Sequence, residues 1–314
     1  MIGAAGMIGR KLCSRLSEQA GGELILHDVV SFEGASAVSD LSAPGEAEKL
    51  VASRPGLIFH LAAVVSGEAE TDFEKGYRVN LDGTRRLFEA IRNAGGGYKP
   101  RVVFTSSIAV FGAPFPEAIG DEFLNAPLTS YGTQKAVCEL LLSDYTRRGF
   151  LDGIGIRLPT ICVRPGKPNK AASGFFSGII REPLAGQEAV LPVPESVRHW
   201  FASPRAAIAF LLHAARLDTA QLGTRRNLSM PGVAATVGEQ IEALRKVAGE
   251  KVARLIRREP DPAIQRIVEG WPRNFAARRA AALGFRADSS FEEIIRIHIE
   301  DELQGSPRLQ AGSA

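Results

Sequence analysis

Tyr131 and Lys135 have the residue types and the spacing needed for acid–base chemistry. They lie four positions apart in the run Ser130-Tyr-Gly-Thr-Gln-Lys135, so on a helix both fall on one face, one turn apart. A phenol with its ordinary pKa near ~10 is a poor base at neutral pH, but an ammonium held beside it favours the phenolate. Ser107 ends the strand-like run 101–107 and offers a hydroxyl. Alone, such a pair more often marks an ordinary surface helix, so the interpretation depends on the rest of the chain.

A glycine-rich turn at the N-terminus supplies that context. Gly3, Gly6 and Gly9 enclose Met7 and Ile8 and precede a helix-like stretch at 7–20. Glycines at this spacing let the backbone turn tightly and approach a pyrophosphate, with the helix N-terminal N–H groups aimed at its oxygens. The pattern predicts a dinucleotide site; the alternative is a purely structural turn.

An acid at the end of the next strand indicates which dinucleotide. Residues 24–28 are strand-like and end in Asp28, nineteen positions after Gly9. A carboxylate there accepts hydrogen bonds from both hydroxyls of an adenosine ribose and repels a 2′-phosphate. This favours NAD over NADP. The alternative for Asp28 is a solvated acid at a strand end.

The first strand of such a fold is unusually short in this chain. Only Met1 and Ile2 precede the first glycine, although this strand is normally central and buried on both faces. We therefore expect a few further residues before Met1.

The elements around these residues alternate between strands and helices. Strands are predicted at 24–28, 56–60, 102–106 and 153–158, and helices at 7–20, 47–54, 73–94, 131–148 and 204–216. This rhythm predicts an α/β fold, a Rossmann-type doubly wound parallel sheet, with a smaller, mainly helical substrate-binding region on the C-terminal side. We divide the chain into an NAD-binding domain (1–163 and 201–222), a substrate-binding region (164–200 and 223–303) and a disordered tail (304–314).

Composition narrows the compartment and the partners. No apolar run among the 314 residues approaches a membrane span, and the three cysteines and five histidines show no metal-ligand spacing. Unpaired cysteines fit a reducing cytoplasm. Residues 151–314 hold 23 Lys and Arg against 17 Asp and Glu, which suits an anionic small substrate. Because aromatic residues do not interleave the basic run 254–258, no nucleic-acid partner is predicted.

Taken together, the motifs resemble those of the extended short-chain dehydrogenases/reductases, the NAD-dependent epimerase/dehydratase group. In chain order they are Gly-x-x-Gly-x-x-Gly, Asp28, Asp40-Leu41, His60-Leu-Ala-Ala63, Asn80-Leu-Asp-Gly-Thr84, Ser106-Ser-Ile-Ala-Val-Phe-Gly112 and the Tyr131/Lys135 pair. The resemblance covers about half the chain. One departure is Phe111, where the family normally has a tyrosine that packs.

The resemblance implies roles for many of these residues. Ser107, Tyr131 and Lys135 are the implied catalytic group. Asp40 should meet the adenine amino group and Leu41 its ring, and Asn80 should be structural. The cofactor site implied is Gly3, Gly6, Met7, Ile8, Gly9, Asp28, Asp40, Leu41, Leu61, Ala62, Ala63, Asn80, Tyr131, Lys135, Pro159 and Ile161, with Thr160 also beside the nicotinamide.

The second half resembles NAD-dependent dehydrogenases that oxidise the C2 hydroxyl of a four-carbon sugar acid such as D-erythronate. The stretches 156–170, 172–186, 198–200 and 270–273 carry this likeness. A sugar-acid carboxylate needs a cation, ideally a guanidinium. Arg198 is the first choice, with Arg164 and Lys170 as rivals.

Hydroxyl-bearing parts of that substrate need polar partners as well. Ser107 and Tyr131 serve the reacting oxygen, while Ser66, Asn169 and Ser173 are candidates for the remaining hydroxyls. Each of these three is more often a loop or surface residue. His199 is expected to pack against Trp200 rather than act in catalysis.

Two other functions remain open at this point. A nucleotide-sugar epimerase or dehydratase would share the fold, the NAD and the Ser/Tyr/Lys group. A redox-sensing or scaffold protein would bind NAD without turnover, but it would be expected to lose one of those three residues. The resemblance also implies a homodimer formed through the helices at 73–94 and 131–148.

Overall fold

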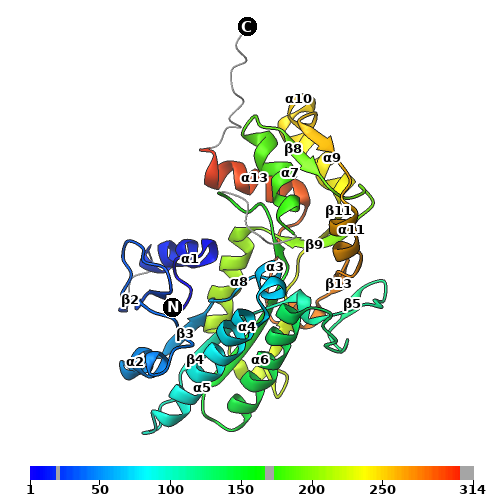
Figure 1. Cartoon of the computed structure of the whole chain (residues 1–314). Helices are drawn as coiled ribbons and strands as arrows, with labels where there is room; N and C mark the ends of the chain where they lie inside the picture. The colour runs from blue at the N-terminus through cyan, green and yellow to red at the C-terminus, as the bar shows by residue number, and fades with distance from the viewer. Residues whose placement is uncertain (19–21, 167–172, 305–314) are drawn as a thin grey trace.

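A parallel sheet forms the centre of the protein in the computed structural model, which describes residues 1–18, 22–166 and 173–304 (Figure 1). Four strands lie in the order β10-β6-β4-β3, every neighbouring pair parallel. They are β3 Leu57–His60, β4 Arg101–Ser107, β6 Asp152–Leu158 and β10 Asn227–Ser229. The predicted α/β fold with a Rossmann-type parallel sheet is confirmed.

Helices cover both faces of this sheet because the side chains of β4 alternate between them. Val103 packs with Leu12 and Phe210, on the side of α1 Met7–Glu18 and α8 Pro204–Arg216. Phe104 packs with Phe88 and Leu142, on the side of α5 Gly83–Asn93 and α6 Ser130–Arg147. The sheet is therefore doubly wound.

Ile2 joins this sheet to a second parallel pair, β1 His27–Asp28 and β2 Ala37–Val38. It forms parallel bridges to both His27 and His60. Ile2 N donates to Phe59 O at 2.9 Å, and Leu61 N donates to Ile2 O at 2.8 Å. Strand β1 is shorter than the predicted 24–28 because only its last two residues pair with β2.

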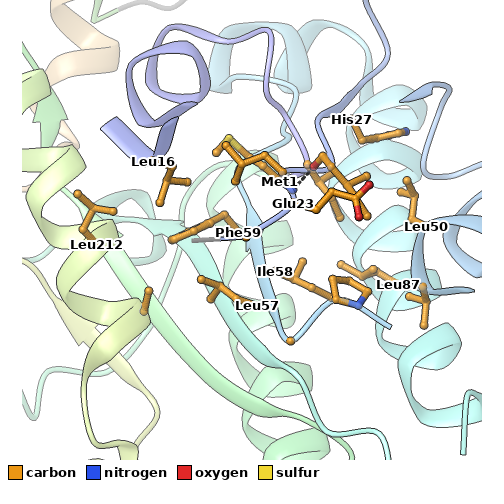
Figure 2. A pocket seen from close by; sticks show the side chains of 18 of the residues that line it. Met1, Leu16, Glu23, His27, Leu50, Leu57, Ile58, Phe59, Leu87 and Leu212 are labelled. Carbon is orange, nitrogen blue, oxygen red and sulfur yellow. Dashed lines mark hydrogen bonds between the residues drawn. The ribbon is translucent and has the colours of Figure 1, made fainter. Parts of the chain in front are cut away.

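An apolar cavity of about 440 Å³ borders the first residue (Figure 2). Its walls include Leu16, Leu57 and Leu212, and the Met1 nitrogen lies 2.6 Å from Ile25 O.

The helix predicted over 73–94 is interrupted. It comprises α4 Phe73–Gly76, a π-helical turn η1 Tyr77–Asp82 and α5. Single π turns inside helices often serve a local function. This turn carries Asn80, whose side chain bonds both the N–H and the C=O of Val64.

The C-terminal side of the chain builds a separate core around Phe176, Phe201, Leu244 and Ile294. Five helices contribute: α7 Gly174–Leu184, α9 Val237–Ala248, α10 Glu250–Ala253, α11 Pro262–Glu269 and α13 Phe291–Glu302. Three small sheets accompany them: β11 Val233–Thr236 with β9 Arg198–Ala202 and β7 Thr160–Ile161; β12 Ile256–Arg258 with β8 Ala189–Leu191; and β13 Phe275–Ala276 with β5 Ile119–Gly120. The region is thus helical with more strand than expected.

The remaining elements are short connections: α2 Glu46–Ala52, α3 Ser66–Thr71, η2 Ile108–Val110, η3 Thr219–Leu222 and α12 Arg278–Ala282. The division into domains stays a prediction, and residues 305–314 of the predicted tail lie outside the described residues. Across the three described ranges, no helix combines the length and the apolar character needed to cross a bilayer.

Candidate active site

The end of strand β4 and the start of helix α6 bring Ser107 and Tyr131 together. Thr129 caps α6, because its hydroxyl accepts from Gly132 N at 3.0 Å. A Cβ on Gly132 would lie 2.1 Å from Ala109 O, so only glycine allows the first turn of α6 to rest on the turn after β4. Ser107 Oγ accepts from Ala109 N at 3.1 Å, and its hydroxyl lies near enough to Tyr131 to influence the pKa of that phenol.

Lys135 lies one helical turn further on and is 2% exposed. Its ammonium donates to Thr105 O at 2.8 Å and lies 4.8 Å from the centroid of the Phe104 ring. The Tyr131 ring centroid is 5.8 Å away. Burial lowers the pKa of Lys135 to about 8. The spacing in the sequence thus places Lys135 beside Tyr131, held by a backbone carbonyl.

The Tyr131 phenol is not activated by these protein groups alone. Burial raises the pKa of Tyr131 to about 12, and the nearby Ser107 hydroxyl only partly opposes this rise. The expectation that Lys135 draws this pKa downward is wrong for the protein groups by themselves, because desolvation of the phenolate outweighs a cation turned towards Thr105. A further positive charge near the ring is needed to favour the phenolate.

A buried ion pair behind Ser107 was not foreseen from the sequence. Glu139, two turns after Tyr131 on α6, binds Arg157 Nε and Nη2 at 2.8 and 2.7 Å. Ser106 Oγ donates to the same carboxylate at 2.6 Å, and Asn125 Nδ2 donates to it at 2.9 Å. This network fixes α6 against the ends of β4 and β6. The only signal of it in the sequence is the i, i+4 spacing of Lys135 and Glu139, which places both on one face of α6.

The three catalytic candidates line one cavity of about 340 Å³. Its other walls come from the ends of β3 and β6, from the start of α7 and from the loop after α11. The predicted residues that line it are Met7, Ile8, Leu61, Ala63, Ser66, Ser107, Tyr131, Lys135, Pro159, Thr160, Ile161, Arg164 and Ser173. Within the described residues, no group of three His, Cys, Asp or Glu side chains could hold a metal ion.

The turn formed by Gly3, Gly6 and Gly9 can approach a phosphate group closely because these residues have no side chains. A Cβ on Gly3, whose φ is +89°, would lie 2.5 Å from Ala62 N, and one on Gly9 would lie 2.3 Å from Gly3 O. Both glycines are therefore required for packing. A Cβ on Gly6 meets only Gly3 O at 3.5 Å, so this exposed glycine keeps a face of the turn open for a ligand to approach.

Asp28 lies beside this turn. Its Oδ2 accepts from Ala5 N at 2.8 Å and its Oδ1 from Val30 N at 3.1 Å. The carboxylate is half-buried, so it keeps access to a ligand. An acid beside a glycine turn of this kind can accept hydrogen bonds from a ribose.

The remaining cofactor candidates lie around the sheet edge. Asp40 accepts from Ser42 N and Oγ and pairs with Arg78, while Leu41 is buried. Asn80 is buried and also donates to Gln134 Oε1 at 2.7 Å. Its contacts are those of a structural residue.

The predicted carboxylate partner Arg198 is not at this cavity. Its guanidinium pairs with Glu239 at 3.2 Å and lines a different hollow with Arg273 and Phe115. Successive side chains of β9 point to opposite faces, so His199 reaches the catalytic cavity and Arg198 cannot. Arg164, its rival, does line the cavity, whereas Lys170 and Asn169 lie outside the described residues.

His199 has a different environment from the one expected. Its ring stacks on Phe176 with centroids 5.2 Å apart and planes at 2°, and it contacts Phe201 and Trp271 rather than Trp200. Nε2 lies 2.6 Å from Thr160 Oγ1 and Nδ1 lies 2.8 Å from Pro272 O. Trp271 and Pro272 line the same cavity; their loop was visible in the sequence only as part of a distinctive string.

Comparison with known proteins places this arrangement among related enzymes. Residues 1–227 match the NAD dependent epimerase/dehydratase family. A D-erythronate dehydrogenase of Cupriavidus necator is 48% identical, with 96% of this chain and 97% of that protein aligned. Its counterpart in Haemophilus influenzae is 42% identical, over 96% of this chain and 99% of that protein.

Among solved structures, one described as the nucleoside-diphosphate-sugar epimerase from Agrobacterium tumefaciens is 69% identical to this chain. It superposes with a TM-score of 0.93, covering 97% of this chain and 94% of that chain. The similar proteins therefore include some named as dehydrogenases and one described as an epimerase.

Proposed function

This chain belongs to the NAD dependent epimerase/dehydratase family, and on that premise we propose that it oxidises the C2 hydroxyl of a small sugar acid such as D-erythronate to the keto acid. One observation carries the proposal. Ser107, Tyr131 and Lys135 line one cavity together with Arg164, so residue types that suit a reacting hydroxyl and a carboxylate border the same space. Two relatives aligned over nearly their whole length are D-erythronate dehydrogenases.

The cofactor is NAD, and the residues fit it. The open face of Gly6 suits the pyrophosphate, Asp28 suits the adenosine ribose, and Pro159 and Ile161 line the same cavity as Tyr131. When bound, NAD supplies the carbon that accepts the hydride and a positively charged ring.

The proton of the substrate hydroxyl passes to the Tyr131 phenolate. The protein alone leaves the pKa of Tyr131 at about 12, so the added positive charge, together with Lys135, favours the phenolate. Ser107 Oγ accepts from Ala109 N, and its O–H turns to the substrate oxygen as carbonyl character develops there. Acid–base help of this kind contributes roughly 10²–10⁴-fold to the rate.

Arg164 takes the role first given to Arg198 and binds the substrate carboxylate. It is half-buried, and no carboxylate in the described part of the chain pairs with its guanidinium. Burial, and then the nearby Arg181 cation, lower the pKa of Arg164. An anion bound there would offset both the burial of the Arg164 charge and its repulsion by Arg181. Ser66 and Ser173 line the same cavity and are candidates for the substrate hydroxyls.

A nucleotide-sugar epimerase is the second candidate, favoured by the description of the Agrobacterium tumefaciens structure. Such an enzyme needs space and charge for a base and a diphosphate. The identities of 48% and 42% to two D-erythronate dehydrogenases, over nearly their whole length, favour the small acid. A protein that binds NAD without turnover has no need of all three catalytic side chains, and this chain keeps them.

A substrate panel tests the proposal. The purified protein with excess NAD is given four- to six-carbon aldonates and uronates, and NADH formation is followed by absorbance. We expect turnover of D-erythronate or a close homologue. An epimerase regenerates its NAD within each cycle and releases no NADH. If no acid gives NADH and a nucleotide sugar is converted, the assignment is reversed.

We also propose a homodimer formed through α4, η1, α5 and α6. Leu140 on α6 is 70% exposed and Phe73 on α4 is 58% exposed, and a paired helical face would bury both. Leu140→Glu should give a monomer in sedimentation velocity. Leu124→Glu is the control, because Leu124 is equally apolar and 80% exposed but lies off these helices; a dimer that survives the first change would contradict this interface.

A reducing compartment, the cytoplasm, is the location that we propose. Cys13, Cys138 and Cys162 form no disulfide, as expected of thiols kept reduced. Cell fractionation against a periplasmic marker tests it.

A further inference from the structure

The hydrogen bonds of His199 fix which of its ring nitrogens carries the proton. Nδ1 lies 2.8 Å from the carbonyl oxygen of Pro272. A carbonyl oxygen only accepts hydrogen bonds, so Nδ1 carries the proton and donates.

The ring itself is neutral. His199 is 3% exposed and lies between the rings of Phe176, Phe201 and Trp271. No carboxylate among the described residues bonds to either nitrogen, and an imidazolium without such a partner is costly in apolar surroundings. In agreement, burial lowers the pKa of His199 to about 4. A neutral imidazole with its proton on Nδ1 has an acceptor at Nε2.

The consequence falls on Thr160. Its Oγ1 lies 2.6 Å from His199 Nε2, and an acceptor nitrogen requires Thr160 to be the donor. The single hydroxyl proton is then used, and the free lone pairs of Oγ1 can only accept. Thr160 and His199 both line the catalytic cavity, so one residue of its wall carries an oxygen that can only accept.

We propose that Thr160, held in this state by His199, is a specificity-determining residue that accepts a hydrogen bond from a substrate hydroxyl other than the reacting one. The inference rests on the proposed function. Arg164 only donates and Thr160 only accepts, so the substrate is oriented with its carboxylate at the first and a hydroxyl at the second. A second carboxylate in place of that hydroxyl would be repelled by Thr160 Oγ1.

A pair of four-carbon substrates tests this assignment. D-Erythronate carries hydroxyls at C3 and C4, whereas 2-hydroxybutanoate lacks both. Thr160→Val keeps the shape and removes the hydroxyl, so the preference for D-erythronate in kcat/KM should fall about 10-fold or more. Thr160→Ser should retain it. The KM for NAD should stay unchanged, because the lost bond is to the substrate.

Two results would overturn the inference. One is an equal loss on both substrates in Thr160→Val, and the other is a raised KM for NAD with the preference intact, which would place Thr160 at the cofactor instead. Nitrogen-15 NMR of His199 gives a readout independent of turnover. A proton on Nε2 rather than Nδ1 refutes the proposed state of Thr160, whereas a wild-type protein inactive on all sugar acids refutes the proposed function.

Discussion

The two sides of the catalytic cavity differ in how far apart in the sequence their lining residues lie. On the dinucleotide side, Ser107, Tyr131 and Lys135 come from one strand and one helix joined by a close glycine contact, so their spacing in the chain fixed their relation in space. On the substrate side, Arg164, His199 and Trp271 come from three segments far apart in the chain. There, position in the sequence was a poor guide.

Arg198 and His199 make this contrast concrete. The argument from charge favoured Arg198, but the alternation along β9 turns it to the outside and brings His199 inside. A strand of five residues is too short to show which of its faces is buried when its partners β7 and β11 are not yet known. The residue of β9 that lines the catalytic cavity is therefore His199, and Arg198 lines a different hollow.

The largest expected effect concerns the dinucleotide side. Tyr131→Phe should lower kcat by roughly 10²–10⁴-fold because the proton acceptor is lost, while NAD binding measured by calorimetry stays near that of the wild type. Turnover close to the wild-type value would remove Tyr131 from the chemistry and with it the proposed function.

Breaking an ion pair should cost more unfolding free energy on the dinucleotide side than on the substrate side. Arg157→Met leaves the Glu139 carboxylate buried without its cation, since their side chains are 11% and 2% exposed, and should cost about 3–5 kcal/mol of unfolding free energy. Arg198→Met, the matched control, breaks a pair that is 40% and 55% exposed and should cost less than about 1 kcal/mol. Urea denaturation measures both; equal losses would contradict the contrast.

The same control sharpens the assignment of the carboxylate partner. Arg164→Met should lower kcat/KM for the sugar acid by about 10–100-fold, mostly through KM, because a charge-assisted hydrogen bond is lost. Arg198→Met should change it less than about 2-fold. A larger effect for Arg198 would restore the choice based on sequence.

Both regions should lose stability as the pH is lowered, because each contains buried histidines. Burial lowers the pKa of His60 to about 3, and those of His199 and His298 to about 4, from the ordinary 6.5. Between pH 6.5 and about 4 the unfolded chain binds protons that the folded protein does not, so stability falls as pH is lowered through this window. Each histidine contributes at most about 1.4 kcal/mol per pH unit.

His298→Met isolates one such contribution. Neither ring nitrogen of His298 has a hydrogen-bond partner in the described part of the structure, so an apolar replacement of similar size removes the titration without breaking a bond. The decrease in unfolding free energy between pH 6.5 and 5 should be smaller than in the wild type. An unchanged decrease would mean that His298 is charged in the folded protein.

The sequence by itself determined the fold class, and it predicted a dinucleotide turn and a catalytic group whose three members line one cavity. These depend on short-range patterns: glycines where a Cβ would strike the backbone, an acid at a strand end, and a helical spacing of four. It also predicted β6 and α8 within a residue of their bounds. The interruption at 77–82 escaped it, because the reach of Asn80 to Val64 is a tertiary contact.

Only the tertiary structure decided that Arg164 rather than Arg198 lines the cavity with Tyr131, that burial raises the pKa of Tyr131, and that His199 Nε2 lies 2.6 Å from Thr160 Oγ1. Each of these depends on the distance or the desolvation between segments that are remote in the chain. Coulomb energies, burial costs and hydrogen-bond directions are set by those separations, and no local spacing encodes them.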